Sequence, residues 1–145
     1  MPTSTPIQTL RQKIYDVLSA AFPNITIYRD GVPRVGAKIP SIAISHVSGS
    51  EYLTAMGRRI GSSVEGEAVR LRFQLDIFQD AQDKVDDAAD KVIKTMFANM
   101  DVFREIGVEK AQMIVCVDVA PETEMTRSEF RKLIDYEFTV EFQPA

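Results

Sequence analysis

The fold is decided by the stretch Val-Arg-Leu-Arg-Phe-Gln-Leu-Asp-Ile-Phe at residues 69–78. Apolar and polar residues alternate strictly from Val69 to Ile77, which is the period of a strand with one buried and one solvated face. Asp80 follows and is a residue type that caps helices. Beyond it, apolar residues recur at helical spacing: Val85, Ala88, Ala89, Val92, Ile93, Met96, Phe97 and Met100. We expect this strand and this helix to pack together through their apolar faces.

The flanking segments predict the rest of the architecture. Thr5-Pro6-Ile7-Gln8 has the pattern of a capped helix start, and Pro23-Asn24 ends that helix. Strands are predicted over 25–29, 41–47, 111–119 and 133–142. The order α-β-β-β-α-β-β over residues 1–145 predicts a single α+β domain, with a mainly antiparallel or mixed sheet and two helices packed on one face. The 111–119 strand is apolar on both faces, so we expect it near the middle of the sheet or under a subunit contact.

Residues 48–68 form the least compact part of the sequence. Glycines interrupt this stretch at intervals, yet it also carries the apolar residues Tyr52, Leu53, Met56 and Ile60. A connection of this length is usually functional or disordered, and these residues are too apolar for a solvated linker. We therefore predict a projecting arm, or an extended hairpin between the second and third strands, that becomes ordered against a partner.

Composition excludes several classes of protein. A chain of 145 residues with a net charge of −4 lacks the cationic surplus of a mainly electrostatic nucleic-acid binder, although a local basic patch is compatible with it. Its single cysteine, Cys116, cannot form an internal disulfide and lies in an apolar run. No apolar stretch is long enough to span a membrane, and the N-terminus lacks the pattern of a targeting segment. We expect a cytoplasmic product.

Two features could in principle carry chemistry. Asp86-Asp87-Ala-Ala-Asp90 matches the D-D-x-x-D sequence that holds Mg²⁺ in prenyl-transferring enzymes, but those are larger all-helical proteins with a second acidic motif. We interpret it as a solvated helix face, on which Asp87 and Asp90 precede Lys91 and Lys94 by four residues. His46 is the only histidine, and sharing a strand face with apolar residues favours a structural or interface role. Nucleophile, metal-ligand and phosphate-loop spacings are all missing from the sequence, so no catalytic residue, metal or cofactor is predicted.

One local concentration of positive charge stands out. Arg58 and Arg59 lie in the predicted arm, and Arg70 and Arg72 lie on the solvated face of the strand that follows. These arginines could be balanced by glutamates of the same segment in a solvated hairpin. Alternatively they form a docking surface for an acidic protein, or line a lumen that passes DNA. The acidic overall charge favours the protein partner over DNA.

The order of these elements resembles the tail-terminator, or tail-completion, proteins of long-tailed bacteriophages. The resemblance rests on the N-terminal amphipathic helix, the strand after Phe22-Pro23-Asn24, the long arm, the 69–78 strand with its Ala/Asp-rich helix, and the closing strand at 133–142. It is a likeness of pattern over nearly the whole chain, without an invariant signature. It implies a virion structural protein, and no catalytic motif comes with it.

The family implies a hexameric ring that caps the finished tail tube, stops its polymerisation and joins tail to head. Partners would be further copies of the chain, the tail tube protein and a neck or head-completion protein, with DNA passing through the lumen. By position, interface residues would be Tyr52, Met56, Arg58 and Arg59 on the arm, with Arg70 and Arg72 beside it; residues 122–131 are a second candidate. Two alternatives stay open: a head-tail connector or neck subunit of the same particle, and a small α+β enzyme or ligand-binding domain.

Overall fold

The computed structural model describes residues 6–33, 36, 38–47, 58–60, 64–119 and 129–142. In chain order the elements are α1 (Pro6–Ala21), β1 (Thr26–Tyr28), β2 (Ser41–His46), β3 (Arg58–Ile60), β4 (Val64–Gln79), α2 (Gln82–Ala98), α3 (Met100–Arg104), β5 (Val108–Val119) and β6 (Phe130–Phe142). The predicted α+β class and element order are confirmed, with a short β3 and a short α3 added to them.

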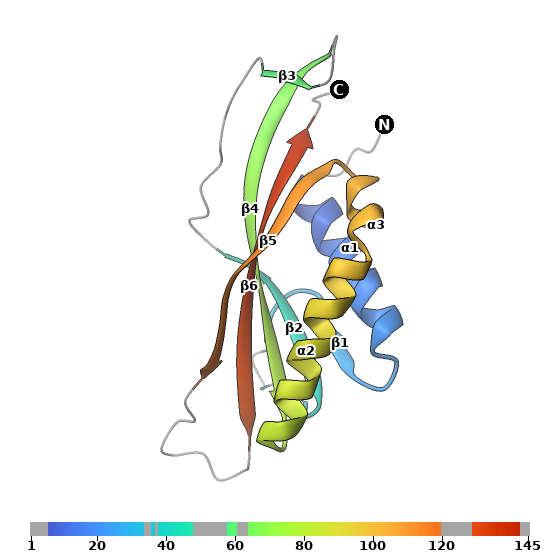
Figure 1. Cartoon of the computed structure of the whole chain (residues 1–145). Coiled ribbons are helices and arrows are strands. Elements are labelled where there is room, and N and C mark those ends of the chain that lie inside the picture. Colours follow the sequence, from blue (N-terminus) through green and yellow to red (C-terminus); the bar gives the residue numbers. More distant parts are fainter. Residues whose placement is uncertain are drawn as a thin grey trace.

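The strands form one mixed sheet in the order β1-β2-β4-β6-β5. Only β1 and β2 run parallel, and the other neighbours are antiparallel. At its N-terminal end β4 also forms a hairpin with β3, which pairs Arg58–Ile60 with Val64–Gly66. In Figure 1 this end of β4 extends beyond the helices, while α1, α2 and α3 all lie on one side of the sheet. The molecule therefore has two layers, and helices cover only one face of its sheet.

The core lies between the sheet and the helices. In β4 the predicted alternation is confirmed, because Leu71, Phe73, Leu75 and Ile77 are all buried. Each is aligned with a buried or half-buried partner on β2 or β6; Phe73, for example, lies between His46 and Tyr136. The helices close the layer with their own apolar stripes: Leu10, Ile14, Val17 and Leu18 from α1, and Val85, Ala88, Ala89, Val92 and Met96 from α2. Burial of each large side chain contributes roughly 1.5–3 kcal/mol, so this interface dominates stability.

Three local predictions are wrong: the cap of α2 by Asp80 and two ion pairs on the surface of that helix. Asp80 does not cap α2; the capping position is Ala81, which has no side-chain cap hydrogen bond, and Asp80 forms an ion pair with Lys84 instead. The expected pairs of Asp87 and Asp90 with the lysines four residues later do not form among these described side chains, and Lys91 lies over the ring of Phe22. At an exposed site, the attraction between a lysine and an aromatic ring is about as strong as the attraction between a lysine and a carboxylate.

The largest difference concerns the 111–119 strand. It lies within β5, at the edge of the sheet and not near its middle. Most of its side chains are exposed, including that of Cys116. Phe97, predicted to belong to the buried stripe of α2, is 83% exposed. These apolar groups are exposed to solvent in the single chain.

Candidate assembly surfaces

The uncovered face of the sheet carries paired charges from β4 and β6. Arg72 donates a hydrogen bond of 2.8 Å from Nη2 to Asp135 Oδ2, and Arg70 Nε lies 3.2 Å from Glu137 Oε1. The register places Arg72 opposite Glu137 and Arg70 opposite Thr139. Each ion pair therefore runs diagonally between the two strands. Arg70 and Arg72, two of the four predicted docking arginines, are thus paired with acids from β6.

A third ion pair on this face is more buried. Asp76 is only 1% exposed, and Arg131 donates to its Oδ1 from both Nε and Nη2, at 3.1 and 2.8 Å. Gln74 donates to the other carboxylate oxygen at 3.0 Å. The Arg131 guanidinium also lies over the ring of Phe78, 5.2 Å from its centroid. This side of the sheet is therefore a polar layer whose charges largely satisfy one another.

Two of the other four predicted interface residues lie on the β3–β4 hairpin. Arg58 and Arg59 belong to β3, where their backbone pairs with Gly66 and Glu65. Tyr52 and Met56 lie outside the described residues, as does most of the 122–131 connection. Arg70 and Arg72 have partners on β6, whereas the side chains of Arg58 and Arg59 lie outside the described part of the structure. The nomination of these six residues as an interface stays a prediction.

The outer edge of β5 is a second candidate surface. Its inner edge pairs with β6, and no described strand pairs with its outer edge. Register shifts lie between Val108 and Lys110 and between Met113 and Val115, which leaves 110–113 as a regular stretch between two irregularities. Met113, Ile114 and Val117 are each more than 40% exposed. An unpaired edge with exposed apolar side chains is a template for pairing with another chain.

An apolar groove runs between the end of α2 and the start of β5. We call it the α2–β5 groove; it has a volume of about 370 Å³ and its lining includes Met96, Phe97, Met100, Ala111, Met113 and Tyr136. Methionine side chains adapt their shape to a partner more readily than branched ones. Burial, with a smaller effect of Cys116, raises the pKa of Tyr136 to about 12, so its hydroxyl stays protonated in neutral solution.

Sequence reasoning missed this groove, although its signal was present. Ile93, Met96 and Phe97 of α2 and Met100 at the start of α3 continue one apolar stripe in the sequence. A stripe alone does not show how far the sheet extends beneath it. Because β5 lies at the sheet edge, the outermost residue of the stripe, Phe97, passes beyond the core. An apolar helix stripe that extends past the edge of the sheet indicates an exposed apolar surface of this kind.

Asp86 and His46, which the sequence offered as possible chemical sites, both contact other side chains of the fold. Asp86 accepts hydrogen bonds from Lys132 at 2.6 Å and Gln82 at 3.0 Å, and the lysine bond lowers the pKa of the Asp86 carboxyl. His46 packs against the Phe73 ring at 5.4 Å; burial, and then the charge of Arg11, lowers the pKa of His46 below 6.5. The described residues contain no group of three His, Cys, Asp or Glu placed to hold a metal ion. No helix among them has the length and apolar character to cross a membrane.

Comparisons with known proteins find likeness in structure only. No protein-family model matches the chain, and no curated protein matches it. The chain is similar to the gp17 protein of bacteriophage SPP1, with 14% identity and a TM-score of 0.50, over 100% of this chain and 99% of that chain. It also matches a chain from the virion of a native gene transfer agent particle, with 13% identity and a TM-score of 0.49, over 96% of this chain and 100% of that chain. At 14% identity, the likeness to the gp17 protein shows a shared fold.

Proposed function

We propose that this chain is a bacteriophage virion structural protein that assembles into a ring of about six copies, as closed cyclic oligomers do. The ring caps the tail tube, ends its polymerisation and provides the surface that joins tail to head. The likeness in fold to a bacteriophage protein over the full length of both chains supports the phage assignment. The action requires no reaction and no cofactor.

The observation that carries the assembly proposal is the apolar surface left open on one subunit. Phe97, Met113 and Val117 are 83%, 42% and 48% exposed, and they lie on or beside a strand edge that no described strand pairs with. Exposed apolar groups next to a free edge are an aggregation hazard for a monomer. They are stable in solution when further copies, or other virion proteins, cover them.

Native mass measurements test this function. The purified chain is measured by light scattering and native mass spectrometry over a range of concentrations, with and without isolated tail tubes, and then imaged by negative stain. We expect rings of about six copies, either in solution or on tube ends. A chain that stays monomeric under every condition, including excess tubes, contradicts the proposal.

The neck subunit of the same particle is the competing assignment, and a growing-tube assay separates the two. A terminator added during tube polymerisation stops elongation and gives short tubes with a ring at one end. A neck subunit leaves tube length unchanged and binds only to tubes that are already terminated, or to heads.

A further inference from the structure

The α2–β5 groove has the features of a built binding site. Tyr136 is part of its lining and is buried, with 6% exposure. Phe97 on the helix side and Met113 on the strand side are both exposed along its walls. An apolar hollow flanked by an exposed aromatic ring and a methionine is suited to receive side chains of a protein segment.

The strand beside the groove can also bind backbone. Residues 110–113 of β5 are regularly paired with β6 on one side, and their outer edge has no strand partner in the described part of the chain. An extended segment can add to such an edge through main-chain hydrogen bonds, while alternate side chains enter the neighbouring pocket. Ala111 and Met113 belong to both the edge and the groove.

We propose that the α2–β5 groove of one copy binds residues 51–60 of a second copy of this chain. The inference deepens the ring assembly proposed above and rests on it. The segment Glu-Tyr-Leu-Thr-Ala-Met-Gly-Arg-Arg-Ile has an apolar middle between an acidic start and two arginines. The groove has an apolar floor, and its lining includes Arg104, Glu109 and Lys110, which are charges of both signs. An apolar centre within a charged rim, matched on both partners, is the usual anatomy of a protein interface.

The sheet order explains why the occupant comes from a second copy. Both β2 and β3 pair with β4, whereas the groove lies beyond β6 on the opposite side of the sheet. Three strand spacings of about 4.8 Å separate β3 from β5, which is roughly 15 Å. Residues 47–57 join β2 to β3, so to reach the groove of their own subunit they would have to cross β4 and β6 and then return. A neighbouring copy meets no such obstacle.

The two contacting parts differ, and this fits a ring. A segment near β3 on one copy binds a groove near β5 on the next, so each copy offers both parts at separate places. Such a head-to-tail interface repeats around a closed ring, whereas a self-complementary patch stops at a dimer.

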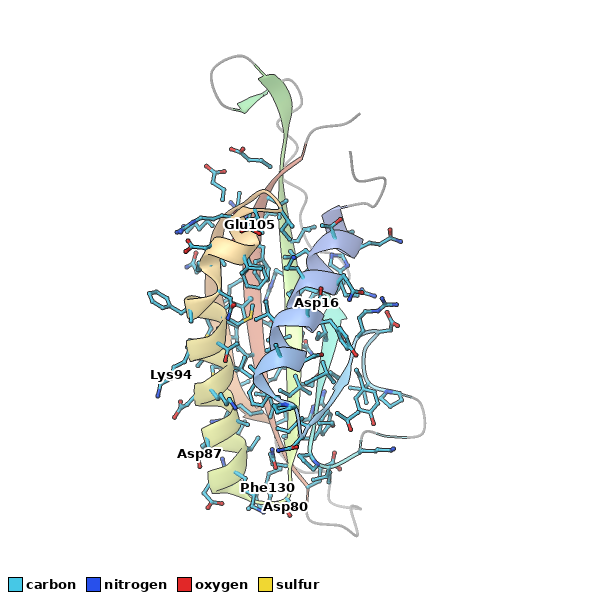
Figure 2. The ribbon with its side chains drawn as sticks, turned by 90° about the vertical axis from the view of Figure 1, so that its right-hand side faces the viewer. Asp16, Asp80, Asp87, Lys94, Glu105 and Phe130 are labelled. Atoms are coloured by element: carbon cyan, nitrogen blue, oxygen red, sulfur yellow. The ribbon has the colours of Figure 1, made fainter. Side chains whose placement is uncertain are left out.

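Disulfide trapping between two variants tests the contact directly. Cys116 is exposed and is first replaced by serine, giving a cysteine-free background. A tagged Phe97→Cys chain is mixed with an untagged Met56→Cys chain under mild oxidation. We expect a mixed disulfide dimer that forms at least tenfold faster than with Phe130→Cys in place of Phe97→Cys. Phe130 is a suitable control because it is 37% exposed and lies at the opposite end of α2 from Glu105 (Figure 2).

Assembly of surface variants gives the second measurement. Phe97→Ser removes an exposed ring from the groove, and Phe130→Ser removes one elsewhere; neither residue belongs to the core. We expect Phe97→Ser to weaken self-association by on the order of tenfold or more, as loss of an aromatic anchor does, and Phe130→Ser to assemble like the wild type. Circular dichroism confirms that both variants are folded.

The outcomes separate this inference from the ring itself. If the wild type forms rings but Phe97→Cys traps Met56→Cys no faster than the control, the ring stands and the groove assignment is wrong. Weakened assembly by Phe97→Ser without the mixed disulfide also overturns it, because the groove then holds another segment or another protein. A wild type that never self-associates, with or without tail tubes, removes the ring and this inference together.

Discussion

Replacing Gly107 with alanine tests the corner where α3 passes into β5, at the upper end of the groove. Gly107 has a φ of +95°, and a Cβ placed on it would lie 2.8 Å from the backbone carbonyl oxygen of Glu141 on β6. The Glu141 amide donates a hydrogen bond of 2.8 Å to the Gly107 carbonyl. Neither backbone can retreat from the added methyl group without straining this bond.

The cost can be worked out from these two features. A left-handed backbone costs a residue with a Cβ about 1–2 kcal/mol, and alanine offsets about 0.4–1 kcal/mol of this by restricting the unfolded chain. Relief of the contact weakens one backbone hydrogen bond, at a further cost of about 1 kcal/mol. Gly31→Ala is the matched control: its φ is +89°, but its Cβ would meet only the Ser45 hydroxyl oxygen, at 3.3 Å, which can rotate away. We expect Gly107→Ala to lose about 1 kcal/mol more stability than Gly31→Ala.

Urea unfolding followed by circular dichroism measures the difference. Both variants should keep the wild-type slope, and Gly107→Ala should have the lower midpoint. The melting temperature should also fall by roughly 2–4 °C for each kcal/mol lost. Equal losses in the two variants would falsify the idea that the close approach of Gly107 to β6 constrains this corner.

Three further perturbations follow from the core and the polar face. Arg131→Ala leaves the buried Asp76 carboxylate with Gln74 as its remaining partner. We expect the free energy of unfolding to fall by about 2–3 kcal/mol, which is below the full effect of breaking a buried pair because Arg131 is partly solvated. The control Arg70→Ala should lose less than about 1 kcal/mol, and urea unfolding measures both. Phe103→Ala in the fully buried cluster should cost about 3–5 kcal/mol by the same assay. Because the folded-state pKa of Tyr136 is raised to about 12, its contribution is complete below pH ~10, where the unfolded chain begins to ionise, and is lost as pH rises toward 12. Melting temperatures of the wild type should therefore fall more steeply across this window than those of Tyr136→Phe, and parallel curves would contradict the raised pKa.

Local sequence patterns predict which side chains of the main elements are buried. Alternation in β4 and β6 and the helical stripes of α1 and α2 predict which side chains face the core, because side-chain direction has a fixed period along a strand or a helix. Leu71, Phe73, Leu75 and Ile77 are buried as this period requires. The α+β class follows, since each one-sided element must cover another.

Partners distant in sequence could not be predicted in this way. Arg72 and Asp135 are separated by 63 positions, and only the β4–β6 register brings them within 2.8 Å. From sequence alone Arg72 resembled a free docking charge, because a charge pattern contains no information about which strand lies alongside. The residues nominated at Tyr52 and Met56 remain predictions.

Sequence by itself determined the helices, the main strands and the buried face of each, because these depend on local periodicity. Tertiary structure alone decided that β5 lies at the sheet edge, that Phe97 passes beyond the core and that a groove opens between them. The physical reason is that strand order is a property of non-local pairing. An apolar strand such as 111–119 has the same sequence signature whether another strand of its own sheet covers it or another subunit does.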